Sequence, residues 1–167
     1  GYAPEGWNHL LNHLKEKGYT LSQMEAANVI VKGRNGSYYD FFRNRVIFPV
    51  IDLRGNVIAF GGRVLDDSKP KYLNTSDTLV FKKSRNLFSM NFAKNAAQKQ
   101  LVLAEGYMDV IAIHAAGFEN VVATLGTSLT NEQARLISKY TKEVVIAYDS
   151  DGAGRSATHR AINLLSE

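Results

Sequence analysis

Four acidic residues in the second half of this 167-residue chain have a spacing that could hold a metal ion. One short apolar run leads into Glu105, and a second one leads into Asp149. Asp109 follows Glu105 by one helical turn, and Asp151 follows Asp149 by two residues. Carboxylates that crowd together repel one another unless one is protonated or a cation lies between them. Because every donor in this set is an oxygen, the pattern predicts a divalent metal site for Mg²⁺ or Mn²⁺.

The elements that would position these acids alternate along the chain. Strands are expected at residues 101–104, 120–124 and 143–148, and helices at residues 107–116, 131–140 and 154–166. A capping box of Thr130 and Gln133 opens the helix at 131–140. A β-α-β-α-β-α order requires a parallel sheet with right-handed crossovers. Ligands of open α/β sheets bind outside the carboxyl ends of the strands, which is where Glu105 and Asp149 would lie.

A competing explanation is that these acids only stabilise helix N-termini, where negative charge interacts favourably with the helix dipole. It applies best to Asp109, whereas Glu105 and Asp149 each follow a strand. The Asp-x-Asp-Gly sequence ending at Gly152 lets two carboxylates face one cation, and its glycine allows a tight turn. A single Asp-x-Asp sequence is common, so both explanations stay open on the residues alone.

The first hundred residues mix helical and strand patterns. Trp7, Leu10, Leu11 and Leu14 recur at helical spacing, which predicts a helix over residues 6–17 with one apolar face. Also expected are a helix from a Thr20–Gln23 capping box to about Asn28, a strand at 29–32, a hairpin of 45–52 and 57–60, and a helix at 91–99. The sequence therefore predicts an α/β protein, α+β overall, with a mixed α+β subdomain over residues 1–100 and a Rossmann-like parallel sheet over residues 101–167.

Charge divides the chain in the same way. The first hundred residues hold 15 Lys and Arg against 8 Asp and Glu, a net charge of +7, whereas residues 101–167 carry −3. A basic part joined to an acidic, metal-type part suggests recognition of a polyanion beside metal chemistry. The alternative is that the cations are only a solvated surface.

Composition excludes several classes of site. The chain has no cysteine, so a disulfide framework, a thiolate zinc site and a cysteine nucleophile are ruled out. No apolar run approaches the length of a membrane helix, and the four histidines lack zinc-ligand spacing. Thr127 and Ser128 have no histidine in a supporting motif, which argues against a hydroxyl nucleophile.

Residues 41–85 form a basic segment in which nine Lys and Arg outnumber four Asp. Aromatic residues are interleaved with these cations: Phe41, Phe42, Phe48, Phe60, Tyr72 and Phe81. Basic side chains can bind phosphates and aromatic faces can stack on bases, so we favour a nucleic-acid or nucleotide-phosphate surface. Most of the phenylalanines are expected to lie in the core.

Three motifs in the second part resemble the Toprim domain that bacterial primases, topoisomerases and some nucleases share. These motifs are Glu105-Gly-Tyr-Met-Asp109, Leu125-Gly-Thr127 and Tyr148-Asp-Ser-Asp-Gly-Ala-Gly-Arg155. Motifs of the first part resemble the polymerase core of DnaG-type bacterial DNA primase: Phe42–Pro49, Gly55–Arg63 and Pro70–Asn74, together with Gly1–Pro4 and Trp7. The resemblance covers essentially the whole chain.

The resemblance implies an enzyme that synthesises RNA primers by metal-dependent nucleotidyl transfer. It implies that Glu105, Asp149 and Asp151 are catalytic acids that hold Mg²⁺ or Mn²⁺, and that Asp109 is a further ligand or a supporting acid. The residues implied to bind the phosphates of template and nucleotide are Arg45, Arg63, Lys71, Tyr72, Asn74, Lys82 and Lys83.

The partners implied by the resemblance are a single-stranded DNA template, nucleoside triphosphates, the RNA primer and the replicative helicase. We expect a monomeric, cytoplasmic protein of the bacterial replisome that does not bind a membrane. The family's zinc-binding domain, its helicase-binding region and a further downstream acidic pair have no counterpart in these residues. We therefore expect the Toprim part to be truncated at its C-terminal end and the isolated chain to have little or no polymerase activity.

Two alternatives stay open. The chain could belong to a Toprim nuclease or topoisomerase, although none of its eight tyrosines can be assigned as a topoisomerase nucleophile. It could also act only as a module that binds nucleic acid or nucleotide. A haloacid-type phosphatase also carries Asp-x-Asp after a strand, but the Gly-Ala-Gly that follows on the third strand argues against it.

Overall fold

The computed structural model describes residues 1–97 and 99–166, and the chain divides into two compact units. The first unit comprises Gly1–Val50 and Ile58–Phe81, and the second comprises Ile51–Val57 and Lys82–Glu167. Residues 82–97 therefore pack with the second unit, although the sequence assigned them to the first subdomain. The division into domains 1–100 and 101–167 stays a prediction.

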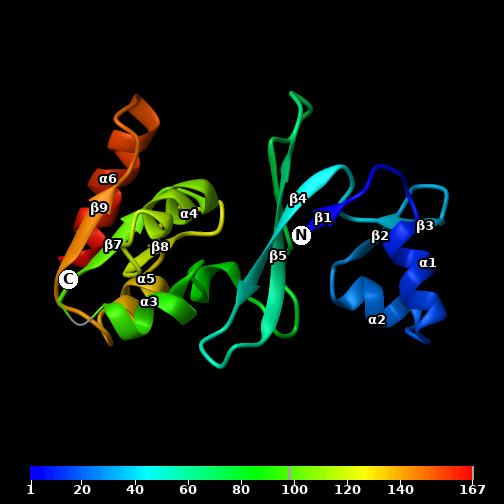
Figure 1. Cartoon of the computed structure of the whole chain (residues 1–167), viewed down its shortest axis with the longest axis horizontal. Helices are drawn as coiled ribbons and strands as arrows, with labels where there is room; N and C mark the ends of the chain where they lie inside the picture. Colours follow the sequence, from blue (N-terminus) through cyan, green and yellow to red (C-terminus); the bar gives the residue numbers. More distant parts are fainter. Residues whose placement is uncertain (98, 167) are drawn as a thin grey trace. The chain divides into compact units, whose positions relative to one another are not determined.

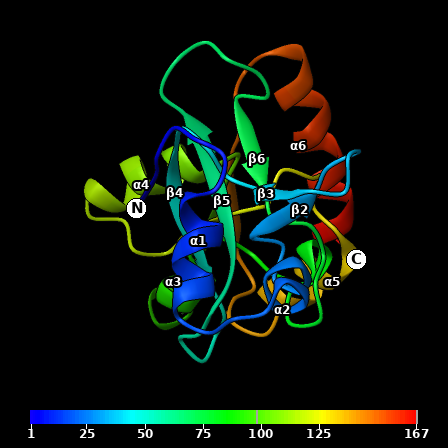
Figure 2. The ribbon, with the colours of Figure 1, turned by 90° about the vertical axis from the view of Figure 1, so that its right-hand side faces the viewer.

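The first unit contains two sheets and two short helices (Figures 1 and 2). Its four-stranded sheet has the order β1-β4-β5-β6, and β2 pairs with β3 as a separate antiparallel ribbon. The elements are β1 (Tyr2–Ala3), α1 (His9–Glu16), α2 (Leu21–Ala26), β2 (Ile30–Lys32), β3 (Tyr38–Asp40), β4 (Arg45–Ile51), β5 (Val57–Val64) and β6 (Tyr72–Asn74). The predicted hairpin is confirmed, because β4 and β5 are neighbours in this sheet.

Helix α1 begins later than the sequence predicted, and this leaves Trp7 outside it. The buried carboxylate of Asp40 accepts hydrogen bonds from the backbone amides of Leu10 and Leu11, both at 2.8 Å. A remote side chain thus satisfies amides that a helix start leaves without partners. Leu11 is buried as predicted, but the Trp7 side chain is 61% exposed and does not join the apolar face.

Both predicted capping boxes are confirmed. The Gln23 amide donates to Thr20 Oγ1 at 3.3 Å, and the Thr20 amide donates to Gln23 Oε1 at 2.8 Å. Thr130 and Gln133 form the same pair of bonds, at 3.2 and 3.0 Å. These reciprocal bonds satisfy two helix-start amides at once, and they explain why α2 and α5 begin where the sequence indicated.

The turn between β4 and β5 is organised by Asp52. Its carboxylate accepts hydrogen bonds from the Arg54 amide at 2.8 Å, the Asn56 amide at 2.9 Å and the Asn56 side-chain amide at 3.1 Å. Hydrogen bonds from Asn56, chiefly from its side chain, hold the pKa of this carboxyl below its ordinary value.

We predict that the turn weakens in acid. Because the folded pKa of Asp52 is depressed, its contribution is fully present above the ordinary aspartate value of about 3.9 and is lost as the pH falls through the folded value. Replacing Asn56 by alanine should raise the Asp52 pKa, which an NMR titration of the side-chain carboxyl carbon measures. An Asp52 carboxyl that titrates identically in the parent and in Asn56→Ala would contradict this assignment.

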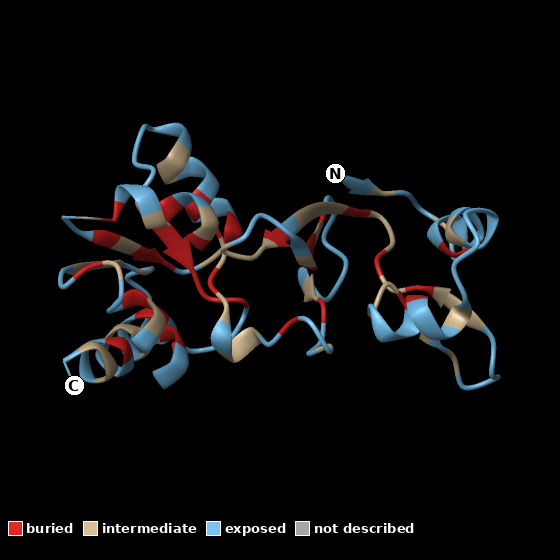
Figure 3. Ribbon diagram, turned by 90° about the horizontal axis from the view of Figure 1, so that it is seen from below, coloured by how far each residue is buried: buried red, intermediate tan, exposed pale blue. Residues whose placement is uncertain are grey.

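The second unit is built around a three-stranded parallel sheet with the order β8-β7-β9 (Figure 1). Its elements are η1 (Lys83–Arg85), α3 (Met90–Ala96), β7 (Leu101–Ala104), α4 (Tyr107–Ala115), β8 (Val121–Ala123), α5 (Asn131–Ile137), β9 (Val144–Ala147) and α6 (Gly152–Leu165). The strands and helices alternate as the sequence predicted, and the α/β fold class is confirmed. Buried residues, red in Figure 3, line β7 and β8. Leu101, Leu103 and Val122 in these strands are fully buried.

Three helices of this unit differ from the prediction by two residues or more. Helix α5 was predicted over residues 131–140 but ends at Ile137. Helix α6 begins at Gly152, two residues early, because the Asp151 side chain caps its N-terminus. Helix α3 was predicted over residues 91–99; it ends at Ala96, and residue 98 of that range lies outside the described residues.

Candidate metal and nucleic-acid-binding site

The strand ends bring two of the predicted acids together. Strands β7 and β9 are parallel neighbours, with Ala104 opposite Ala147, so Glu105 and Asp149 leave the same carboxyl edge of the sheet. The backbone amide of Asp149 donates a hydrogen bond to Glu105 Oε2 at 3.1 Å. Both side chains are exposed to solvent. An exposed pair of carboxylates at the carboxyl edge of a parallel sheet is the arrangement from which we predicted a metal site.

The other two predicted acids cap helices. Asp109 Oδ2 accepts a hydrogen bond from the Gly106 amide at 3.0 Å, at the start of α4. Asp151 Oδ1 accepts one from the Gly154 amide at 2.7 Å, at the start of α6. The helix-terminus explanation is therefore correct for part of the set, and it leaves the second oxygen of each carboxylate for another role.

Gly154 lets the two halves of the Asp-x-Asp loop approach one another closely. A Cβ atom on Gly154 would lie 2.0 Å from the carbonyl oxygen of Asp149 and 2.8 Å from its carbonyl carbon. Both contacts are with backbone, so a side chain at residue 154 would force the loop to move. The sequence argument singled out Gly152 for this role, but a Cβ on Gly152 would meet no atom within 4 Å.

The donor chemistry of the edge fits a hard divalent cation. Across residues 1–97 and 99–166, no three His, Asp or Glu side chains converge closely enough to hold a metal ion by themselves. The Glu105–Asp149 pair fits Mg²⁺, which typically takes one or two carboxylates and completes its shell with water and substrate phosphates. Asp151 and Asp109 lie on the segments that follow these two acids and could supply further oxygens.

A pocket of about 310 Å³ adjoins Glu105 within the second unit. Tyr148 and Arg160 line it together with the 126–129 loop and the neighbouring Thr124. Burial, reinforced by the negative charge of Glu105, raises the pKa of Tyr148 to about 12, so its hydroxyl stays protonated at neutral pH. The pocket thus offers a neutral hydroxyl and a guanidinium beside the Glu105 carboxylate.

In the first unit, three of the predicted phosphate-binding residues occupy two adjacent strands (Figure 2). Arg63 of β5 pairs with Tyr72 of β6, and its guanidinium carbon lies 5.9 Å from the Tyr72 ring centroid. Asn74 pairs with Gly61 two positions along. Arg63 Nε is buried and has no hydrogen-bond partner. A buried donor left without a partner is costly, which is consistent with a group that a ligand satisfies.

The guanidinium of Arg45 is bound to backbone carbonyls of the first unit. Its side chain is only 7% exposed, and its guanidinium donates to the carbonyl oxygens of Pro70 at 2.9 Å and Lys71 at 3.4 Å. Burial, together with the neighbouring charge of Arg43, lowers the pKa of Arg45. Arg45 therefore fixes the backbone that presents Lys71, and a direct bond from Arg45 to phosphate stays a prediction.

Lys82 and Lys83 belong to the second unit, where a residue that sequence reasoning missed supports their segment. Gln133 is fully buried, and its side-chain amide donates to the carbonyls of Lys83 at 2.9 Å and Asn86 at 2.8 Å. The capping box signalled the bond of Gln133 to Thr130, but nothing in the sequence signalled these bonds across 50 and 47 residues.

Comparison with protein families identifies both parts of the chain. Residues 1–94 match the N-terminal domain of the DNA primase catalytic core, and residues 99–167 match the Toprim domain. The chain belongs to the bacterial DNA primase family. A DNA primase of Clostridium acetobutylicum is 54% identical over 168 residues, which cover all of this chain and 28% of that protein.

Solved primase structures share the fold. The zinc-binding and RNA polymerase domains of Aquifex aeolicus primase align with a TM-score of 0.90 and 45% identity over 99% of this chain and 41% of that one. A DnaG primase catalytic domain bound to single-stranded DNA aligns with a TM-score of 0.86 and 40% identity, covering 98% and 54%. The match of residues 1–94 to a primase-specific domain removes the topoisomerase and nuclease alternatives.

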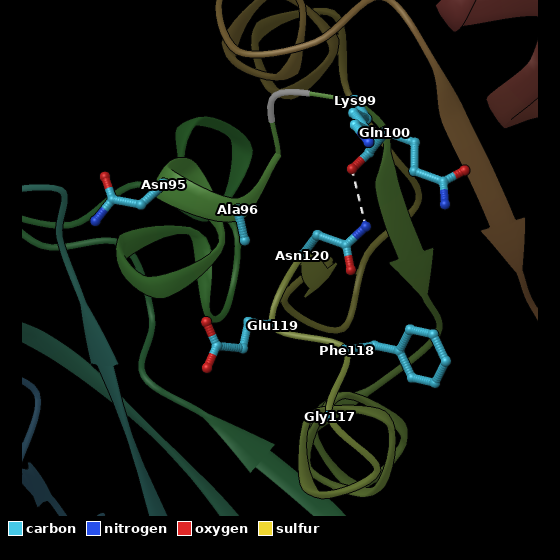
Figure 4. Close-up of a pocket in the computed structure, with 8 residues that line it drawn as sticks. All are labelled: Asn95, Ala96, Lys99, Gln100, Gly117, Phe118, Glu119 and Asn120. Atoms are coloured by element: carbon cyan, nitrogen blue, oxygen red, sulfur yellow. Dashed lines mark hydrogen bonds between the residues drawn. The ribbon is translucent and has the colours of Figure 1, made fainter.

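The second unit has a further pocket, at the sheet edge opposite to that of Glu105 and Asp149. It measures about 440 Å³ and lies at the amino edge of the sheet, where Gln100 precedes β7 and Asn120 precedes β8 (Figure 4). Between these two lining residues, the Asn120 side chain donates a hydrogen bond to the Gln100 carbonyl at 2.9 Å.

Among the described helices, none is both long and apolar enough to cross a membrane.

Proposed function

We propose that this chain is the catalytic centre of a primase that joins nucleoside triphosphates into short RNA primers on a single-stranded DNA template. The observation that carries the proposal is the hydrogen bond from the Asp149 amide to Glu105, which joins two carboxylate-bearing strand ends in a chain of primase ancestry. The chain spans about a quarter of the length of the curated relatives, 28% for that of Clostridium acetobutylicum. The activity therefore belongs to a longer protein.

In this proposal Glu105, Asp149 and Asp151 hold Mg²⁺ or Mn²⁺, with Asp109 as a further ligand or as the residue that fixes the start of α4. The bound cation would neutralise the charge that develops on the transferred phosphate. The Asp149–Glu105 bond keeps the two strand ends together, so the carboxylates are oriented before substrate arrives.

The cations of the first unit would bind phosphates of the template and of the incoming nucleotide. Arg63 brings a guanidinium with an unused donor, and Tyr72 lies beside it. Arg45 holds the backbone of residues 70 and 71, so Lys71 would be presented by an anchored loop. Lys82, Lys83 and Asn74 complete the proposed phosphate-binding set. Binding of the replicative helicase would use a part of the protein beyond these residues.

We predict that Mn²⁺ affinity depends on Asp149. Replacing Asp149 by asparagine should weaken Mn²⁺ binding at least about tenfold, because even residues that only support metal ligands are worth that much. Paramagnetic relaxation of water measures the bound ion, with and without a nucleoside triphosphate. The nucleotide should strengthen binding in the parent, because its phosphates supply ligands that the protein lacks.

A matched control is Glu143→Gln. Glu143 is exposed and precedes β9, so its replacement removes one negative charge at the opposite end of the same strand. Mn²⁺ binding by this variant should equal that of the parent. If Asp149→Asn and Glu143→Gln bound Mn²⁺ with the same affinity, the proposed metal site would be overturned. Asp149 would then matter no more to the ion than a carboxylate at the opposite end of the same strand.

A further inference from the structure

The pocket beside Glu105 is formed by residues of the second unit alone. Its walls come from the 126–129 loop, the end of β9 and one face of α6. On α6 the lining residues are Ala153, Ala157 and Arg160, which follow the spacing of a single helix face. The short side chains of the two alanines leave room for a ligand between α6 and the loop.

Arg160 supplies the positive charge of this pocket. It is exposed, and its guanidinium makes no hydrogen bond or ion pair with any residue in the ranges 1–97 and 99–166. Arg155 of the same helix, by contrast, uses its Nε to donate to the Ser150 carbonyl at 3.0 Å. A guanidinium carries several N–H donors and no acceptor, so Arg160 is suited to a ligand that brings acceptor oxygens.

Thr124 provides a second donor that lacks a partner. Its side chain is only 7% exposed, yet its hydroxyl bonds to no residue in the described part of the chain. Buried hydroxyls are nearly always hydrogen-bonded, so this one requires a partner from the contents of the pocket. The Tyr148 hydroxyl also lines the pocket, and none of the described residues bonds to it.

The 126–129 loop adds backbone donors. Gly126 has a φ of +76°, which turns the chain directly after the β8 end. The amides of Gly126, Thr127 and Ser128 donate no hydrogen bond to the residues that the structure describes. Successive free backbone amides are a common setting for phosphate oxygens. Guanidinium, hydroxyl and amide donors therefore line one cavity of about 310 Å³.

We propose that this pocket receives the pyrophosphate that nucleotidyl transfer releases, with Arg160 and Thr124 as its principal ligands. The inference rests on the proposed function and adds a site for the second product of that reaction. In the transfer, a bond forms between the primer 3′-oxygen and the α-phosphorus of the nucleotide. The bond from this phosphorus to the bridging oxygen breaks, its electron pair leaves with pyrophosphate, and the proton of the 3′-hydroxyl passes to water.

Glu105 connects the pocket to the proposed metal site. Of the four predicted acids, Glu105 lines the pocket, so a cation held by Glu105 and Asp149 would border it. A bare carboxylate repels phosphate oxygens, whereas a bound cation attracts them, so pyrophosphate should bind together with the cation. The cavity lies at the lower end of the range of about 300–1,000 Å³ for ligand pockets. This size suits a small anion better than a nucleotide paired with its template.

Calorimetry with pyrophosphate and equimolar Mg²⁺ tests the site on the 167-residue chain. Arg160→Ala should bind pyrophosphate about tenfold to a hundredfold more weakly, the usual loss of a hydrogen bond to a charged group. Thr124→Val keeps the shape of the side chain without its hydroxyl, and it should bind about twofold to tenfold more weakly. The matched control is Arg135→Ala, which removes an exposed guanidinium of α5 outside the pocket lining. It should bind like the parent.

A nucleoside monophosphate with Mg²⁺ is the matched ligand, because it carries a phosphate but no leaving group. Its affinity should be the same for the parent and for Arg160→Ala. If Arg160→Ala weakened both ligands equally, Arg160 would attract phosphates in general, and the assignment to pyrophosphate would be overturned. Arg160 is exposed on α6 and alanine is a strong helix former, so this variant should fold.

Mn²⁺ relaxation separates this inference from the proposed function. Without pyrophosphate, Arg160→Ala should bind Mn²⁺ at least as tightly as the parent, because Arg160 is no metal ligand. A parent chain that binds Mn²⁺ but not pyrophosphate overturns the inference and keeps the metal site. Equal pyrophosphate affinities of Arg160→Ala and Arg135→Ala do the same. A parent chain that binds no Mn²⁺, either alone or with pyrophosphate, overturns the metal site and the inference together.

Discussion

Replacing Gly154 by alanine is expected to disorganise the Asp-x-Asp loop and to lower Mn²⁺ affinity about tenfold or more. The added Cβ would lie 2.0 Å from the carbonyl oxygen of Asp149, far inside van der Waals contact. Relief requires the backbone of residue 149 or the start of α6 to move. Either movement changes the bond from the Gly154 amide to Asp151 and the orientation of both acids. Overpacking of this kind costs about 1–3 kcal/mol of unfolding free energy.

The matched control is two residues earlier. A Cβ on Gly152, the first residue of α6, would meet no atom within 4 Å. Gly152→Ala should therefore leave Mn²⁺ binding unchanged and keep the unfolding free energy within about 1 kcal/mol of the parent, since alanine is the better helix former. Urea denaturation and Mn²⁺ relaxation, measured on both variants, check the pair of expectations.

The comparison of the two glycines is decisive because both changes add the same methyl group to the first turn of α6. A Gly154→Ala variant that binds Mn²⁺ like Gly152→Ala would mean that the positions of Asp149 and Asp151 do not govern the metal. It would contradict the proposed ligand set even if the variant were less stable. A loss confined to stability would leave Gly154 as a residue required only for folding.

Much of the second unit could be predicted because its signals are local. Apolar runs and capping boxes each lie within a few residues of the element they define, and the parallel direction of the strands follows from the alternation of strands and helices. The carboxyl edge could be predicted for the same reason, since Glu105 and Asp149 each end a strand. The exact contact between them could not, because it depends on which strands are neighbours.

The residues that sequence reasoning missed act over long separations. Asp40 bonds to amides 29 and 30 residues away, and Gln133 bonds to carbonyls 47 and 50 residues away. Neither residue stands in a local pattern that indicates these partners. Trp7 was assigned to an apolar helix face from its spacing, because periodicity cannot tell that a remote carboxylate starts the helix only after it.

We expect the Asp40→Ala variant to lose about 2–4 kcal/mol of unfolding free energy in the first unit. The Asp40 side chain is 3% exposed, and its two oxygens each accept an amide of α1 at 2.8 Å. Asn8 precedes α1 but makes no capping hydrogen bond, so no local residue replaces the lost acceptors. A lost helix cap costs about 1 kcal/mol, and a buried amide left without a partner costs about 1–3 kcal/mol more. Hydrogen exchange of the Leu10 and Leu11 amides measures the effect where it arises.

Two further variants show whether the effect belongs to the acceptors or to the charge. Asp40→Asn keeps one side-chain oxygen, so it can serve one amide and should lose about half as much stability. Glu16→Ala removes an exposed negative charge at the other end of α1 and should leave both exchange rates unchanged. If all three variants exchanged alike, α1 would be held by the packing of Leu11 alone. If only the Asp40 variants exchange faster, a single buried carboxylate sets where α1 begins, and the exposure of Trp7 follows from it.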